Sequence, residues 1–548
     1  MCIQANLTVA PRLHSRAFFV LTLLLATLLS GCAVGPDFRQ PEAPRSTAYT
    51  PQPLEMETAS ALVLAGNAQK YNAAANIPAD WWTLFRSPAI NSLITRAFNN
   101  NPSLQTVQAT LRQAQQNVIA QQGYFYPSTS LDYSPSRTKI AGNLGSSAPG
   151  LQANGDNISA DPAGAPVYYS FHVAQLSVGY VPDIFGGNRR QVESLQAQLQ
   201  AQHFQAEASY ITLASNIVAA ALQEATLRAQ IKSSREIIRL NNENLDILSK
   251  QLALGFIAGI DYSAQEAASA QAEQSLIPLL KQLEQTRNLL RALAGNLPDE
   301  EVAETFELEA IQLPLELPLS LPSQLVEQRP DIRAAQAQWH AASAQVGVAV
   351  AGRLPQFTLT AAVGGMASTP DWMFREGGSF FSVLGNISMP LFNGSTLKAR
   401  EQAAREGLTQ AAADYRRVVI TAFQNVADTL HAIRYDAEYL KAALRTHNAL
   451  KETASLTRKQ YDLGYASYQL VLLAEQNFQQ AEIGLIQAQA ARLADTAALY
   501  QALGGGWWNL PEAKPSTPLQ PSASSTQATD GGSNIQPTAP LLTESHVP

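Results

Sequence analysis

The chain has 548 residues, of which 46% are hydrophobic and only 15% are charged, and its formal net charge is −7. This modest negative charge excludes a strongly basic nucleic-acid binder, so we expect no nucleic acid among its partners. The seven histidines are scattered without the spacing of a metal site, and we therefore expect no metal, no cofactor and no enzymatic activity.

The N-terminus has the features of a secretory signal. Arg12 and Arg16 precede an apolar run over 17–29, which is too short for a membrane span and ends in Leu29-Ser30-Gly31-Cys32. This tetrapeptide resembles the lipobox of bacterial lipoproteins, which implies cleavage after residue 31 and attachment of N-palmitoyl and S-diacylglycerol groups to Cys32. Ala33 implies sorting to the outer membrane, where a lipid-anchored protein would extend into the periplasm. An ordinary signal peptide with a chance cysteine is the alternative.

The remainder of the chain is duplicated. Asn101-Pro102 in the first half corresponds to Arg329-Pro330 in the second, at an offset of 330 − 102 = 228 residues. Farther along, Ile184-Phe185-Gly186-Gly187 corresponds to Leu391-Phe392-Asn393-Gly394, at an offset of only 391 − 184 = 207 residues. The first copy therefore carries about twenty extra residues near its middle. A duplicated unit with an insertion in one loop indicates an architectural repeat rather than a catalytic core.

Each repeat predicts a long helical hairpin. Residues 188–254 contain neither Gly nor Pro, and at about 1.5 Å per residue they predict a helix approaching 100 Å. Apolar residues recur along it with the heptad rhythm of a coiled coil, at Leu199, Ala206, Leu213 and Ala220. The second repeat predicts a matching helix over about 395–463. A Leu-Gly turn ends each long helix, and a return helix follows it.

The other end of each repeat is predicted to be β. Helices over 103–125 and 331–353 end just before a proline. Short alternating segments then predict four strands, at 129–135, 168–181, 356–364 and 380–391. The loops between the strands of each repeat are expected over 136–167 and 366–378.

These strands bear on the oligomeric state. No apolar stretch of the mature chain is long enough for a membrane helix, so entry into a bilayer would require the strands. Four strands cannot close a barrel, whereas two chains would give eight strands and three would give twelve. Because eight strands leave an interior just large enough for side chains, a pore favours the trimer. A small soluble β-hairpin is the alternative.

Several motifs together carry a resemblance to a known family. They are Cys32-Ala33-Val34-Gly35-Pro36-Asp37-Phe38, Trp81-Trp82, the two Leu-Gly turns and Ala502-Leu503-Gly504-Gly505-Gly506-Trp507. On these residues the chain resembles the outer-membrane factors of tripartite efflux systems, which are TolC-like, and in particular their lipoprotein branch (OprM/NodT type).

The resemblance implies an α+β membrane protein. Its internally duplicated chain would give four β-strands to a trimeric, 12-stranded outer-membrane β-barrel joined to a long periplasmic α-helical coiled-coil barrel. The implied partners are two further copies of the chain, a periplasmic adaptor (a membrane fusion protein), an inner-membrane pump of the resistance-nodulation-division type and outer-membrane lipid.

The expected domain organisation follows the repeats. The predicted parts are a lipoprotein signal peptide at 1–31, a lipid-anchored segment at 32–80, the first repeat at 81–298, a linker at 299–322, the second repeat at 323–508 and a disordered periplasmic tail at 509–548.

The hairpin tips are the predicted gate, because helices that lean inward there close a tube. In the family, a Leu-Asp-Ala-Gln-Arg-like run on the last helix constricts the tip. Here Leu473 stands where Asp is common and Gln476 where Arg is common, so we expect a hydrophobic constriction at Leu473. Packing of Leu473 in the helix seam is the alternative. Asp261 and Asp462 also lie near the tips, where solvated turn carboxylates are the alternative to a gate role.

The turns themselves are expected to contact the adaptor. The residues assigned to this contact are Gly255, Gly259, Gly464 and Tyr465.

Three functions remain open at this point: an efflux channel for small molecules, the outer-membrane duct of a type I protein secretion system, and a structural coiled-coil lipoprotein without a pore. The lipobox and the closing Gly-Gly-Gly-Trp motif favour the first over the second. The duplicated strands disfavour the third, because a spacer needs no hairpins at its far end.

Overall fold

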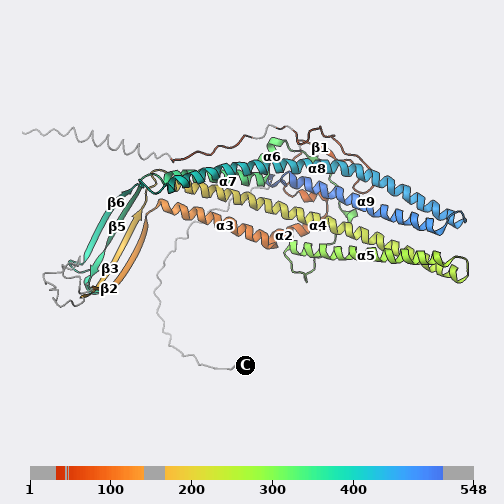
Figure 1. The fold of residues 1–548 in the computed structure, drawn as a ribbon, viewed down its shortest axis with the longest axis horizontal. Helices are drawn as coiled ribbons and strands as arrows, with labels where there is room; N and C mark the ends of the chain where they lie inside the picture. Colours follow the sequence, from red (N-terminus) through yellow and green to blue (C-terminus); the bar gives the residue numbers. More distant parts are fainter. Residues whose placement is uncertain (1–32, 43–45, 47, 74, 141–166, 510–548) are drawn as a thin grey trace, which may run out of the picture. The chain divides into compact units, whose positions relative to one another are not determined.

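The computed structural model describes residues 33–42, 46, 48–73, 75–140 and 167–509. Two copies of one unit, helix–strand–strand–helix–helix, follow each other along the chain (Figure 1). The first copy consists of α3 (Pro102–Gln122), β2 (Ser128–Ile140), β3 (Val167–Tyr180), α4 (Gly187–Ala253) and α5 (Gly259–Ala294). The second consists of α7 (Pro330–Ala351), β5 (Gln356–Ala367), β6 (Ser379–Ser388), α8 (Thr396–Asp462) and α9 (Tyr468–Ala502).

Shorter elements lie before, within, between and after the two copies. They are the helices α2 (Pro88–Asn100) and α6 (Pro322–Gln328), the strands β1 (Lys70–Asn72) and β4 (Glu316–Pro318), and the 3₁₀ turns η1 (Trp81–Phe85), η2 (Gly123–Phe125), η4 (Leu308–Ala310), η5 (Pro370–Trp372) and η6 (Trp507–Asn509). Strands β1 and β4 pair in parallel, so the segment before the first repeat is joined to the segment between the repeats.

The two long helices, α4 and α8, each have 67 residues, which corresponds to about 100 Å. The seam predicted for α4 is largely buried, since Ala206, Leu213 and Ala220 have exposed fractions of 8% or less. Within the described ranges, no helix combines the length and the apolar character that a membrane span requires.

Tryptophans join the two repeats in the main hydrophobic core. Trp81 is fully buried and stacks on Tyr500 of α9, with ring centroids 5.5 Å apart. Trp507 donates from Nε1 to the carbonyl oxygen of Gln328, 2.6 Å away, at the start of the second repeat. The aromatic pairs at the two ends of the duplicated region therefore pack where the repeats meet.

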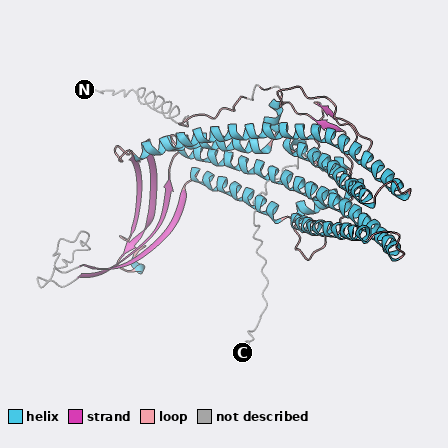
Figure 2. Ribbon diagram, turned by 45° about the vertical axis from the view of Figure 1, so that its right-hand side comes forward, coloured by secondary structure: helices cyan, strands magenta, loops and turns pink. Residues whose placement is uncertain are grey.

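The four long strands form one antiparallel sheet in the order β2-β3-β5-β6 (Figure 2). One row of paired residues crosses all four strands: Leu131, Leu176, Val363 and Phe381. Successive side chains in a strand point to opposite faces, so this apolar row shares one face and the neighbouring row shares the other. The neighbouring row is Ser130, Ser177, Ala362 and Ser382. The sheet thus has an apolar face and a more polar face.

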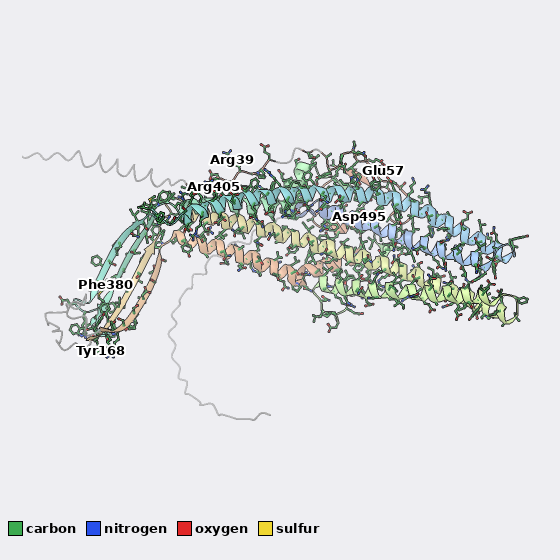
Figure 3. All side chains as sticks on the ribbon, viewed as in Figure 1. Arg39, Glu57, Tyr168, Phe380, Arg405 and Asp495 are labelled. Atoms are coloured by element: carbon green, nitrogen blue, oxygen red, sulfur yellow. The ribbon has the colours of Figure 1, made fainter. Side chains whose placement is uncertain are left out.

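Strand lengths differ from those predicted from the sequence. The strand predicted over 129–135 continues to Ile140, because the polar residues of a segment assigned to the loop pair with β3 as far as Val167. Strand β5 likewise continues past Gly364 to Ala367. By contrast, β6 ends at Ser388 rather than at residue 391, since Pro390 has no N–H to donate to a ladder. Tyr168 and Phe380, labelled in Figure 3, stand on β3 and β6.

Candidate functional site

The two hairpin tips are built by the same local device. Gly255 and Gly464 have φ of 76° and 80°, the left-handed conformation that ends a helix at low cost only for glycine. The amide of Phe256 donates to the carbonyl of Gln251 at 2.9 Å, and the amide of Tyr465 donates to that of Gln460 at 2.8 Å. These bonds from residue i to i−5 are those of a Schellman motif, so both tips are tight turns rather than loose loops.

The tips present apolar side chains to solvent. Leu254 and Phe256 are 71% and 76% exposed at the first tip, and Leu463 and Tyr465 are 71% and 84% exposed at the second. Exposed apolar side chains that repeat at two equivalent turns are typical of a protein contact surface. Gly259 has a different role from Gly255, because it is the first residue of α5 and has no left-handed backbone.

Behind the tips, a chain of buried hydrogen bonds joins the two hairpins. Tyr468 of α9 donates from its hydroxyl to Oε1 of Gln265 in α5, at 2.7 Å. Gln265 in turn donates from Nε2 to the carbonyl oxygen of Asn241 in α4, at 2.8 Å. Gln265 is fully buried and Tyr468 is 3% exposed, so their bond lies inside the contact between the two hairpins and would break if the hairpins separated.

A partly exposed ion pair lies beside this chain. Arg458 of α8 is 3.6 Å from Glu475 of α9 and donates to Oδ1 of Asn244 in α4, at 3.2 Å. Burial raises the pKa of Glu475, and the Arg458 charge acts in the opposite direction. We call this set the tip interlock; its members are Asn241, Asn244, Gln265, Arg458, Tyr468 and Glu475.

The tip interlock brings helices from both repeats together. It joins α4 and α5 of the first repeat to α8 and α9 of the second, and apolar side chains of Leu248, Val471 and Leu472 surround it. Farther from the tips, a groove between α4 and the α8–α9 hairpin is lined by residues that include Glu236, Lys451 and Glu482.

The gate residues predicted from the sequence lie near the interlock but not in it. Leu473 is 54% exposed and Gln476 is exposed one turn farther along α9. Asp462 is 4.0 Å from Arg458, whereas Asp261 stands in the first turn of α5, where a carboxylate complements the helix dipole. Cys32, the predicted lipidation site, lies outside the described residues, as do the predicted signal peptide and residues 510–548 of the predicted tail.

Sequence comparison places this architecture among known proteins. A family model described as outer membrane efflux protein matches residues 93–296 and 321–505, one match for each repeat. The chain belongs to the outer membrane efflux protein family. This confirms the resemblance predicted from the sequence motifs and the duplicated fold class. The family is one of outer-membrane efflux channels.

Individual relatives of this outer membrane efflux protein match most of its length. The toluene efflux pump outer membrane protein TtgC of Pseudomonas putida is 27% identical over 485 residues, which cover 88% of this chain and 94% of TtgC. The pyoverdine export outer membrane protein OpmQ of Pseudomonas aeruginosa is 29% identical over 470 residues, covering 84% and 94% of the two chains. The solved outer-membrane channel OprN matches with a TM-score of 0.74 and 25% identity, over 87% of this chain and 100% of OprN.

The sequence did not reveal the interlock of this outer membrane efflux protein. Gln265 is one of many glutamines on Ala- and Gln-rich helices, and nothing local distinguishes it from an exposed one. Tyr468 lies four residues after a turn glycine, which suggests a contact near the tip but does not name a partner. Only the packing of α5 against α9 selects these two residues.

Proposed function

We propose that this outer membrane efflux protein is the passive exit duct of a tripartite efflux system. It would receive small toxic compounds from an inner-membrane pump of the resistance-nodulation-division type through a periplasmic adaptor. The observation that carries the proposal is the repeated junction of a strand pair with a helix of 67 residues, because it joins a sheet with an apolar face to helices about 100 Å long. The relatives TtgC and OpmQ, which are named as outer membrane proteins of toluene efflux and pyoverdine export, support the same function.

The working unit is proposed to be a homotrimer. In a single chain, β2 and β6 are the edges of the sheet and leave unpaired backbone groups along them. Each such group costs several kcal/mol in hydrocarbon, so the edges must be paired by neighbouring copies. Three copies provide twelve strands and an interior wider than that of an eight-stranded barrel.

Cys32 is proposed to carry the lipid anchor of this trimer in the outer membrane. The lipobox supports this assignment, and lipid at Cys32 would be an attachment additional to the embedded sheet.

The tip interlock is proposed to hold the duct closed. Separating the two hairpins would break the Tyr468–Gln265 bond, whose net contribution is about 0.5–1.5 kcal/mol because the freed groups would bond to water. Leu473 and Gln476, on the exposed side of α9, are then available to form a constriction with their copies in the trimer. The adaptor is proposed to bind at the turns of Gly255 and Gly464, together with Gly259 and Tyr465.

The cargo is not set by membership of the family. TtgC is named for toluene, an apolar solvent, and OpmQ is named for pyoverdine. Both match this chain at similar identity, so we propose that selectivity belongs mainly to the pump.

Deletion of the gene tests the function. We expect greater sensitivity to a panel of antibiotics, dyes and organic solvents that includes toluene, with an unchanged profile of secreted proteins. Complementation with the wild-type gene is the control. Lost secretion with unchanged sensitivity would overturn the proposal in favour of a type I secretion duct.

Conductance of the purified protein in planar bilayers tests the pore directly. A structural spacer would show no conductance even in a variant with a loosened tip, and that result would overturn the channel.

A further inference from the structure

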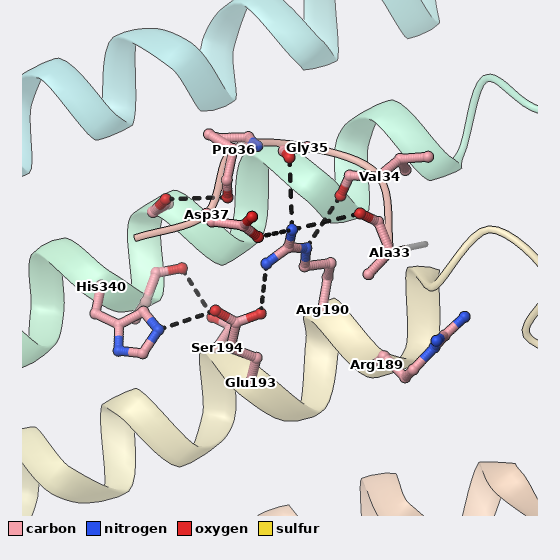
Figure 4. Close-up of polar contacts among 12 residues, drawn as sticks. Ala33, Val34, Gly35, Pro36, Asp37, Arg189, Arg190, Glu193, Ser194 and His340 are labelled. Atoms are coloured by element: carbon pink, nitrogen blue, oxygen red, sulfur yellow. Dashed lines mark hydrogen bonds and ion pairs between the residues drawn. The ribbon is translucent and has the colours of Figure 1, made fainter. Parts of the chain in front are cut away.

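Residues 33–38, the first described residues of the chain, lie in a seat formed by the start of α4 and the second half of α7 (Figure 4). The amide of Val34 donates to the carbonyl of Phe185 at 3.1 Å. The ring of Phe38 stacks on that of His340, with centroids 4.6 Å apart and planes inclined by 16°. Because α4 belongs to the first repeat and α7 to the second, the segment ties the two repeats together where their helices meet the strands.

Arg190 is the centre of the seat. Its Nε donates to the carbonyl of Val34 at 3.0 Å, and its Nη2 donates to Oδ1 of Asp37 at 2.7 Å and to the carbonyls of Ala33 and Gly35 at 3.4 Å. On the other side, Nη1 donates to Oε2 of Glu193 at 2.8 Å.

The Arg190 side chain is only 6% exposed, so these contacts replace its water. Without the segment, Glu193 would be the remaining partner of the Arg190 guanidinium among the described residues, and a buried charge that loses its partners is costly. The guanidinium therefore favours the docked position of residues 33–37.

Two glycines allow the segment to lie against the helix backbone. A Cβ atom on Gly35 would lie 2.4 Å from Cα of Gly347, and a Cβ atom on Gly347 would lie 2.7 Å from the carbonyl oxygen of Val34. Both distances are far below ordinary contact, so neither position accepts a side chain while the segment is docked.

The duplication shows that the chain has this seat at one of its two equivalent places, the one formed by α4 and α7. By the offset of 207, Arg190 corresponds to Leu397 and Glu193 to Arg400, since 190 + 207 = 397 and 193 + 207 = 400. By the offset of 228, Gly347 corresponds to Ile119, since 347 − 228 = 119. The equivalent place, formed by α8 and α3, thus has Leu397 where the seat has Arg190 and the branched side chain of Ile119 where the seat requires glycine. One such seat is sufficient, because each chain has one N-terminus.

We propose that Arg190 is a positioning residue that fixes the modified N-terminus at the junction of strands and helices. The proposal rests on the lipidation of Cys32 proposed above. Cys32 directly precedes Ala33 in the sequence, and neighbouring Cα atoms are about 3.8 Å apart. A lipid on Cys32 would then be attached next to a segment that Arg190 holds, rather than at the end of a free tether.

A spin label at Arg39→Cys tests this positioning, because Arg39 is exposed and directly follows Phe38 (Figure 3). In an otherwise unchanged full-length protein we expect an immobilised label. Arg190→Leu, which installs the residue of the second repeat, should shorten the rotational correlation time at least about threefold. Gly347→Ile should do the same by filling the seat without changing its charge.

Two further variants separate positioning from general damage. Arg190→Lys keeps the positive charge but replaces the planar guanidinium, which donates in several directions at once, with a compact ammonium. We therefore expect the mobility of the spin label to be intermediate. Arg353→Leu removes another junction arginine, which pairs with Glu401 of α8, and should leave the label immobilised. If Arg190→Leu does not fold, the mobility of the label in Arg190→Lys and Gly347→Ile decides whether the proposal holds.

An immobilised label in both Arg190→Lys and Gly347→Ile would overturn the proposal. Mass spectrometry of the labelled protein examines lipidation separately, since an unmodified Cys32 would lack acyl mass and accept a second label. That result would refute lipidation and with it the positioning of an anchor, even if the mobility changes identified Arg190 as a clamp of the N-terminus.

Discussion

Glycine at residue 255 and glycine at residue 259 look alike in the sequence but differ in what their backbones require. Gly255 needs the left-handed conformation, with φ of 76°, whereas Gly259 opens α5 with open space around its missing Cβ. Alanine at 255 should therefore destabilise the tip by about 1 kcal/mol, and alanine at 259 should be neutral or stabilising.

Hydrogen exchange at the tip amides measures this difference. We expect exchange of the Phe256 amide to accelerate about fivefold in Gly255→Ala. No acceleration is expected in Gly259→Ala, which serves as the matched control. Equal effects of the two substitutions would contradict the assignment of Gly255 as the turn residue.

Asp436 of α8 is a single residue that should make stability depend on pH. Burial, reinforced by the nearby Asp495 of α9 and opposed by Arg492, raises the pKa of Asp436 to about 7 (Asp495 is labelled in Figure 3). In the unfolded chain this carboxyl titrates near 4, so between about pH 4 and pH 7 the folded state holds a proton that the unfolded state has lost. Stability from this group is thus greatest at low pH and falls as the pH rises through that interval.

Asp436→Asn should remove this part of the pH dependence. We expect the melting temperature of the wild-type protein to fall between pH 5 and pH 8, and the fall to be smaller in the variant. Asp414→Asn, which alters an exposed carboxylate on the same helix, is the control. An identical slope in all three proteins would show that Asp436 is ionised normally.

At the scale of elements, the contact between the two helical hairpins depends on the Tyr468–Gln265 bond. Tyr468→Phe removes the donor and leaves Oε1 of Gln265 buried, which should weaken the closed arrangement by about 1–3 kcal/mol. We expect faster uptake of a large antibiotic and a higher bilayer conductance. Tyr439→Phe, at a 60% exposed tyrosine of α8 outside the tip turns, should change neither. Unchanged uptake in Tyr468→Phe would show that the interlock does not hold the channel closed.

The β-sheet makes a second prediction at this scale, because its two faces differ. Val363 lies in the apolar row with Leu131, Leu176 and Phe381, and the adjacent Ala362 lies on the other face. A lysine on the lipid side near the bilayer midplane costs about 2–4 kcal/mol. Val363→Lys should therefore lower the amount of heat-resistant channel in the outer membrane, whereas Ala362→Lys should be tolerated. The reverse order would assign the apolar face to the lumen.

At the scale of the whole molecule, the open sheet edges predict the stoichiometry. Native mass spectrometry of the detergent-solubilised channel should give three chains, since β2 and β6 must find partners and twelve strands leave room for a pore. Boiling should release single chains. A stable species of two chains would contradict the proposed barrel.

Much of the fold could be predicted from the sequence because its signals are local. The uninterrupted helix formers over 188–254, the glycines that end them and the prolines that precede the strands each act through their immediate neighbours. Because the unit is duplicated, the elements predicted for one repeat support those predicted at the equivalent positions of the other. Strand ends were less predictable, since the ladder that extends β2 to Ile140 depends on pairing with β3 rather than on composition.

By itself, the sequence determined the duplicated order of elements, the approximate helix lengths and the family resemblance, because propensity, capping and repeated motifs are written along the chain. The tertiary structure alone decided which polar residues matter. Gln265, an ordinary helix residue by composition, became part of the interlock through a helix 203 residues away in sequence. Arg190 likewise became a clamp only because residues 33–37, more than 150 positions earlier, lie against it. Burial against a distant segment removes water from a polar group, so the group then depends on its protein partner for a hydrogen bond. No local sequence pattern predicts which polar groups become buried in this way.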